Sequence, residues 1–168
     1  MVSVKCLASG SAGNSYAVDD GKSVLLLEAG IRKRTILAGY MDLLMRVQGC
    51  LITHEHQDHA KAALGLPMAG IDVYASGGTF SALNAEKDRR NYRLHSIKAG
   101  EQFTLGTWTV LPWEAQHDAA EPLGFLLHSK ETRDKLIFAT DTYFIPNTFR
   151  GLTYICLLYT SDAADDRI

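Results

Sequence analysis

The stretch LITHEHQDH, residues 51–59, decides how this sequence is interpreted. His54 and His56 are two residues apart, so in an extended segment both rings project to one side and can bind one metal ion. Asp58 and His59 are neighbours, and where the chain turns into a helix their side chains diverge from that pair and can serve a second ion. The alternative, a polar loop that happens to be rich in histidine, is a poor match to three histidines and an aspartate within six residues. The stretch therefore predicts a strand, a ligand loop and a helix.

The flanking segments predict a chain in which strands predominate and helices are interspersed. Apolar patterns predict strands at residues 2–7, 16–18, 24–27, 49–52, 73–75, 101–105, 107–113, 125–129 and 136–139. Helical spacing predicts helices at residues 31–47, at residues 60–66 before Pro67, and at residues 77–85. The charged segment EKDRRNYR is expected to be a solvated loop, with a phosphate-binding patch as the alternative. The basic residues of that patch are Lys87, Arg89, Arg90 and Arg93.

Composition restricts the class of protein. The length of 168 residues suits one domain, and 46% hydrophobic with 21% charged residues is ordinary for a globular protein that buries a core. The net charge of −2 gives no overall positive field toward nucleic acid or an anionic membrane. No signal-peptide core and no run of membrane-spanning length is present, so we expect a cytoplasmic protein without a membrane partner, and no protein partner is predicted. Three widely spaced cysteines argue against a disulfide framework.

The chain resembles the metallo-β-lactamase superfamily, because HEHQDH fills all four fixed positions of its HxHxDH signature. In that superfamily a further histidine lies on a downstream loop and a later aspartate bridges both metals. His117 in AQHDAAEPLGF and Asp141 in FATDT occupy such positions, although each taken alone suits an ordinary loop histidine or a turn aspartate. The ligands that the resemblance implies are His54, His56 and His117 for the first ion, Asp58 and His59 for the second, and Asp141 between them. Two divalent ions are implied, with zinc favoured and manganese or iron as alternatives.

Within the superfamily the chain is most similar to the WalJ/YycJ group of bacterial and phage proteins, which are regarded as nucleases acting on DNA. Three stretches within residues 7–142 carry the resemblance: LASGSAGNS, LITHEHQDH, and HDAAEPLGF with FATDT. In the first, Asn14 and Ser15 belong either to a simple tight turn or to the floor of the active site. The group usually has Asp where this chain has Glu28, a longer carboxylate that can still accept hydrogen bonds from the ligand loop. Tyr143 stands where Gly is common.

The resemblance implies a mixed α/β (α+β) fold class, the metallo-β-lactamase αββα sandwich, incomplete at the C-terminus. It also implies a metal-dependent phosphodiesterase, a DNA nuclease of exonuclease type that uses a metal-activated water, with nucleic acid as substrate. Asp58 is the expected catalytic residue, which orients that water or accepts its proton. The alternatives are hydrolysis of thioester, lactone or β-lactam bonds on the same fold, and an inactive truncated fragment.

The tail differs in composition from the rest of the chain. Residues 156–168, CLLYTSDAADDRI, resemble a translated adapter from transposon-based sequencing libraries, which leaves residues 1–155 as the N-terminal part of the predicted domain. The alternative is a native final strand, ICLLY, with an acidic end. Superfamily members carry one more metal-binding histidine in the C-terminal part, and in this sequence no histidine follows His128. We therefore expect this chain to hold the first ion more tightly than the second.

Overall fold

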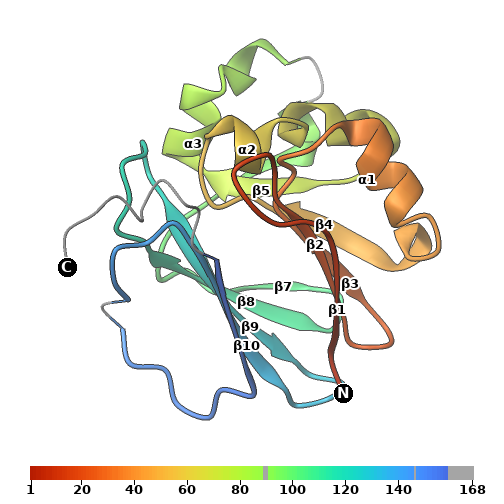
Figure 1. Cartoon of the computed structure of the whole chain (residues 1–168), viewed down its shortest axis with the longest axis vertical. Helices are drawn as coiled ribbons and strands as arrows, with labels where there is room; N and C mark the ends of the chain where they lie inside the picture. Colours follow the sequence, from red (N-terminus) through yellow and green to blue (C-terminus); the bar gives the residue numbers. More distant parts are fainter. Residues whose placement is uncertain (89–90, 146, 159–168) are drawn as a thin grey trace.

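The computed structural model describes residues 1–88, 91–145 and 147–158, which form two β-sheets packed face to face (Figure 1). Sheet A is ordered β1 (Ser3–Ala8), β2 (Ser15–Asp19), β3 (Val24–Leu27), β4 (Val47–Leu51), β5 (Val73–Ser76) and β6 (Leu94–Ile97). Sheet B is ordered β11 (Tyr154–Leu158), β10 (Lys135–Thr140), β9 (Leu123–Ser129), β8 (Trp108–Glu114) and β7 (Phe103–Leu105). Strands β1 to β3 pair antiparallel, whereas β3 to β6 pair in parallel. The predicted mixed α/β class with two sheets is confirmed.

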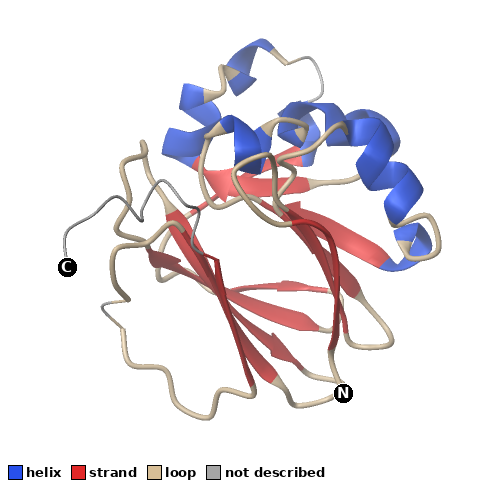
Figure 2. Cartoon of the chain, viewed as in Figure 1, coloured by secondary structure: helices blue, strands red, loops and turns tan. Residues whose placement is uncertain are grey.

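The helices connect the parallel strands and cover the outer face of sheet A (Figure 2). They are α1 (Lys33–Gly39), η1 (Leu44–Arg46), α2 (Gln57–Ala60), η2 (Ala63–Ala69), α3 (Gly77–Ala82), η3 (Ala85–Lys87) and η4 (Asn91–Arg93). A parallel pair needs a crossover between its strands, and crossovers of one hand place their helices on one face. Within the described ranges, the outer face of sheet B carries no helix. None of these helices has the length and apolar character needed to cross a bilayer.

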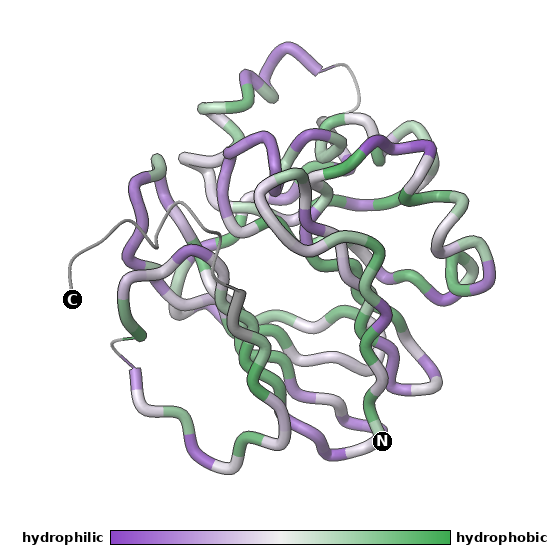
Figure 3. Tube along the Cα trace, viewed as in Figure 1, coloured by the Kyte–Doolittle hydropathy of each residue, from purple (hydrophilic) through white to green (hydrophobic). Residues whose placement is uncertain are grey.

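The central strands of sheet A carry buried apolar side chains on both faces, because the sheet separates two cores. Figure 3 colours the apolar residues along the trace green. In β3, Val24 and Leu26 pack toward the helices, while Leu25 and Leu27 pack toward sheet B. All four side chains are buried, which explains the continuous apolar run VLLL in place of an alternating pattern. On the sheet B side, Trp108 lies fully within the inter-sheet core. This packing fixes the two sheets against each other, and it thereby fixes the positions of their loops relative to one another at one end of the sandwich.

The predicted helix at residues 31–47 is wrong over its second half. Helix α1 ends at Gly39, a short 3-10 turn follows, and Val47 already begins strand β4 beside Val24. Gly39 lies so close to β1 that an added Cβ would come within 2.4 Å of the Leu7 side chain. Tyr40 is buried, and its hydroxyl lies 3.2 Å from the Ser15 hydroxyl. The apolar spacing thus serves tertiary contacts of a helix and a turn.

Of the two other predicted helices, the first is shifted and the second is shorter than predicted. In place of a helix at residues 60–66, α2 occupies Gln57–Ala60 and the 3-10 helix η2 continues through Pro67 to Ala69, where Gly70 with a φ of 78° ends it. Helix α3 ends at Ala82, three residues before the predicted end at residue 85. Its start is fixed by Ser76, whose side chain accepts a hydrogen bond from the Thr79 amide.

Three further segments can be compared with the predictions from the sequence: β6, the charged segment and the tail. Strand β6 was not among the predicted strands, and its apolar residues are interrupted by His95. The charged segment contains the 3-10 turns η3 and η4, Arg93 in it forms an ion pair with Asp72 at 2.6 Å, and residues 89–90 lie outside the described residues. Strand β11 includes residues 156–158 of the tail and pairs in parallel with β10. The origin of the tail stays a prediction, and residues 159–168 lie outside the described part.

Candidate metal centre

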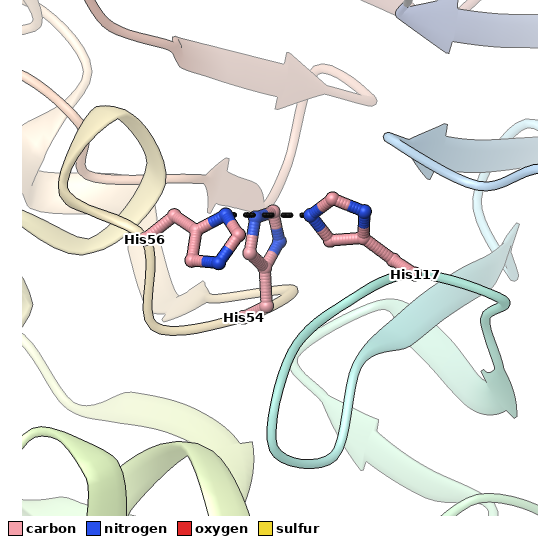
Figure 4. Close-up of side chains that lie close together, drawn as sticks. All are labelled: His54, His56 and His117. Atoms are coloured by element: carbon pink, nitrogen blue, oxygen red, sulfur yellow. Dashed lines mark hydrogen bonds between the residues drawn. The ribbon is translucent and has the colours of Figure 1, made fainter. Parts of the chain in front are cut away.

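The predicted ligand residues converge at one end of the sandwich, from loops of both sheets. Figure 4 shows three of them, the histidines at positions 54, 56 and 117. His54 and His56 lie in the loop that follows β4, and His56 is the residue before helix α2. His117 comes from the loop between β8 and β9, and Asp141 directly follows β10. The local stretch of residues 51–59 therefore supplies part of the centre, and sheet packing brings the rest to it.

Three histidines form the first group. The ligand atoms of His54, His56 and His117 lie within 4.8 Å of one another, with 3.3 Å between His117 Nε2 and His56 Nδ1. His54 is 1% exposed, its Nδ1 lies 2.9 Å from the Thr53 hydroxyl, and its Nε2 has no hydrogen-bond partner among the described residues. Burial, together with the neighbouring histidines, lowers the pKa of His54 to about 2. A neutral imidazole with one buried unpaired nitrogen is the form that binds a metal ion.

A second group, rich in carboxylates, lies beside the first. Asp58, His59 and Asp141 place ligand atoms within 4.8 Å of one another. His59 Nε2 is 2.8 Å from Asp141 Oδ2 and 3.3 Å from Asp58 Oδ2. The same Asp141 oxygen is 3.8 Å from His54 Nε2, so this carboxylate lies between the two groups. The backbone of Asp141 has a φ of 48°, a left-handed conformation that side-chain-bearing residues seldom adopt outside special sites.

Glu28 supports both groups from beneath. It is buried with a φ of 66°, and its two carboxylate oxygens accept hydrogen bonds from the Thr53 amide at 2.8 Å and the Thr53 hydroxyl at 2.9 Å. Glu28 Oε2 also contacts His59 Nδ1. Burial acts against a charged His59, but Glu28 and Asp141 outweigh it and raise the pKa of His59 to about 10. Glu28 thereby holds the Nδ1 proton and turns Nε2 toward Asp58 and Asp141.

The loop after β1 clamps helix α2. The Asn14 amide donates to the Asp58 carbonyl at 2.8 Å, and the Asn14 side chain donates to the same carbonyl at 3.1 Å and to the Gly10 carbonyl at 3.0 Å. Gly30 passes so near that an added Cβ would lie 1.6 Å from the Asp58 carbonyl oxygen. Asn14 thus lies under the centre. Ser15 is buried, and its hydroxyl lies 3.2 Å from that of Tyr40, away from the ligand atoms.

The structure adds supporting residues that sequence patterns did not single out. Glu55 Oε1 accepts from the Ala120 amide at 2.8 Å, which ties the loop after β4 to the loop that carries His117. Glu121 Oε2 accepts from the Gly78 amide at 2.7 Å, which ties the His117 loop to helix α3. The Thr53 and Thr140 hydroxyls are 3.1 Å apart and join the two sheets beneath the centre. Glu55 lies inside HEHQDH and Glu121 inside AAEPLGF, but no sequence pattern signals their roles because their hydrogen-bond partners are distant in sequence.

A cavity of about 460 Å³ opens beside His117. Its lining includes Gln116 and His117, and its charged residues are Glu114 and Glu121. No lysine or arginine lines it among the described residues. The described walls of this cavity therefore provide no positive side chain that would attract an anion.

Comparisons with known proteins identify a family and several relatives of this chain. A family model described as the beta-lactamase superfamily domain matches residues 27–162. The chain is 32% identical over 156 residues to an exodeoxyribonuclease YycJ of Bacillus anthracis, covering 87% of this chain and 56% of that protein. It is 29% identical over 153 residues to an exodeoxyribonuclease WalJ of Streptococcus pneumoniae, with the same coverage of both chains.

Solved structures share the fold at lower sequence identity. The metallo-beta-lactamase fold protein YhfI from Bacillus subtilis aligns with a TM-score of 0.65 at 14% identity, over 84% of this chain and 62% of that one. The Rm3 metallo-beta-lactamase aligns with a TM-score of 0.64 at 18% identity, over 88% of this chain and 62% of that one. The chain spans a little over half the length of the curated nucleases that it matches, 56% in both cases.

Proposed function

This chain belongs to the metallo-β-lactamase superfamily, and from that premise we propose that it is part of a metal-dependent nuclease that hydrolyses phosphodiester bonds of DNA. The observation that carries the proposal is the buried Nε2 of His54, which has no hydrogen-bond partner in the described part of the chain and lies close to His56 and His117, beside a second, carboxylate-rich group. The names of the curated relatives, both exodeoxyribonucleases, support DNA as the substrate.

The donor atoms fit divalent cations. We assign His54, His56 and His117 to a first ion, Asp58 and His59 to a second, and Asp141 to a position between them. The carboxylates of Glu28, Asp58 and Asp141 surround the buried His59, and their negative charge favours a cation at the second position. Imidazole and carboxylate ligands suit zinc, which we favour, and also manganese or iron. When bound, such ions supply Lewis acidity toward a phosphoryl oxygen and make a water molecule acidic enough to ionise near neutral pH.

The side chains of the chain itself supply position and proton transfer. Asp58 is half-buried, and its Oδ2 lies 3.3 Å from His59 Nε2, at the open side of the second group. We assign to Asp58 the role of orienting the attacking water and accepting its proton, which a carboxylate at this place can share with ligation. Glu28 holds the orientation of His59, and Thr53 holds that of His54. Because a water attacks, the mechanism requires no nucleophile from the protein.

A panel of substrates tests the proposal. The purified chain, supplied with zinc or manganese, is expected to cleave a labelled DNA oligonucleotide, to stop in the presence of EDTA, and to leave a thioester, a lactone and a β-lactam intact. Turnover of one of these carbonyl substrates, with none of DNA, overturns the nuclease proposal in favour of a carbonyl hydrolase on the same fold. A chain that binds the metal but cleaves nothing supports the inactive fragment that the sequence leaves as an alternative.

Glu55 offers a specific prediction about the His117 loop. Glu55→Ala removes the acceptor for the Ala120 amide, so His117 is held less firmly and zinc affinity is expected to fall by roughly 10- to 100-fold. Glu55→Gln keeps an oxygen acceptor of similar reach and should retain most of the affinity. Competition with a chromophoric chelator measures both. Equal affinities of the alanine variant and the unmodified chain would show that the contact does not position His117.

A further inference from the structure

Two exposed aromatic residues follow the predicted bridging aspartate closely in the sequence, and the ring of the first lies beside His117. Among the described residues, the exposed large aromatic side chains are Tyr92, Tyr143 and Phe144. Tyr92 is remote in sequence from the centre, and the guanidinium of Arg93 lies 5.6 Å from its ring. Tyr143 and Phe144, which are 74% and 59% exposed, are the second and third residues after Asp141. Neighbouring exposed apolar residues commonly mark a binding surface.

The exposure of these rings is fixed by the backbone around them. The Tyr143 amide donates to the Gln116 carbonyl at 2.9 Å. The Thr142 hydroxyl accepts from the Gln116 amide at 3.0 Å and donates to the Phe144 carbonyl at 2.9 Å. On the far side, Ile145 packs against a small core cluster that includes Trp113 and Ile137. The segment is therefore fastened at both ends, and the two rings are presented outward.

The position of the Tyr143 ring beside His117 indicates which part of a bound nucleotide this surface would contact. The Tyr143 ring centroid is 6.4 Å from that of His117, and the planes are inclined by 51°. A phosphodiester held at the histidines carries its sugar and base only a few ångströms away, within reach of this surface. The neighbouring cavity adds no basic side chain, so attraction between basic side chains and the phosphates of a nucleic acid contributes little to binding there. Base stacking on aromatic rings supplies affinity that does not depend on positive charge.

We propose that Tyr143 and Phe144 form a subsite that stacks the base of the nucleotide whose phosphate lies at the metal centre. The inference rests on the proposed function and narrows its substrate class to an unpaired strand or a frayed strand end. Inside a duplex both faces of a base are covered by its neighbours, so only an unstacked base can lie on these rings. The two residues determine which form of nucleic acid enters.

Equilibrium binding tests the subsite without relying on turnover. The probe is a fluorescent single-stranded DNA whose terminal linkages are phosphorothioates, which slow cleavage, compared with the same strand carrying an abasic residue at the terminal position. With zinc present, Tyr143→Ala and Phe144→Ala are each expected to weaken binding of the intact strand by roughly 5- to 100-fold. Neither substitution should change binding of the abasic strand. Tyr143→Phe keeps the ring and should bind as the unmodified chain does.

Tyr92→Ala provides the matched control, because Tyr92 is 70% exposed and the same atoms are removed. Equal affinity of the unmodified chain for the intact and abasic strands overturns the inference, as does an equal loss for Tyr92→Ala and Tyr143→Ala. Base-dependent binding by a chain that cleaves no DNA supports the subsite while the nuclease proposal fails. If the chain cleaves DNA but its binding does not depend on the terminal base, the nuclease proposal is supported and the subsite fails. The two failures are therefore distinguishable.

Discussion

Replacement of His56 by alanine is expected to lower kcat/KM for DNA hydrolysis by more than about 100-fold. The loss of residues that merely orient a metal ligand costs roughly 10- to 100-fold, and removing a ligand itself should cost more. His56 is exposed and its side chain makes no capping bond to helix α2, so the free energy of unfolding in the absence of metal should change by less than about 0.5 kcal/mol. Steady-state kinetics and thermal unfolding with EDTA measure the two quantities.

His128→Ala is the control for this substitution. His128 lies in strand β9 opposite Thr109 and Lys135, outside both groups of clustered ligand residues. Its removal should leave DNA hydrolysis within about two-fold of the unmodified chain, since surface changes away from a site have small effects. Metal-independent hydrolysis that survives His56→Ala contradicts the assignment of the reaction to this centre.

Glu28→Ala is expected to destabilise the protein by about 3–5 kcal/mol and to weaken zinc binding by roughly 10- to 100-fold. The carboxylate is buried, and its removal leaves the Thr53 amide and His59 Nδ1 without their acceptor. The first effect follows from an uncompensated buried group and the second from the loss of a fixed orientation for His59. Chemical denaturation and chelator competition separate them.

Asp20→Ala provides a matched control for Glu28. Asp20 is also buried, and it accepts hydrogen bonds from the hydroxyls of Thr107 at 2.6 Å and Ser129 at 2.8 Å, so its loss should likewise destabilise the sandwich. It belongs to none of the ligand groups and should leave zinc affinity unchanged. If both variants lose zinc affinity to the same extent, the effect of Glu28 is one of general stability and the assigned orienting role is wrong.

The sequence predicted most of the strands and the closeness of the ligand side chains within residues 51–59, for a physical reason, while metal binding by these side chains stays a prediction. His54, His56, Asp58 and His59 lie within six residues, so their spacing alone constrains where the side chains point. Strands such as β3 are apolar over their full length because both faces are buried. His117 and Asp141 came from the resemblance to a family, since only the packing of sheet B against sheet A brings them beside His54.

Other features depend on contacts between distant segments and were not predicted. The periodic apolar residues after Gly39 indicated a longer helix, but Tyr40 is drawn into the core and Val47 is needed in β4. The bond from Glu55 to Ala120 spans 65 residues, and neither letter signals its partner. The same holds for Tyr143, which stood out only as a departure from glycine. Its nearness to His117 required the fold.

The measurement that tests the account most directly is the metal content of the purified 168-residue chain after exposure to excess zinc and dialysis. We expect about one zinc ion to be retained per chain, held by the three histidines, with a second ion that binds only while zinc is in excess. The His54→Ala chain should retain less than about a tenth of that amount, because the buried Nε2 that has no other hydrogen-bond partner is gone. Two tightly held ions per chain would contradict the ranking of the sites. Zinc retention no greater than that of His54→Ala would contradict the metal centre itself.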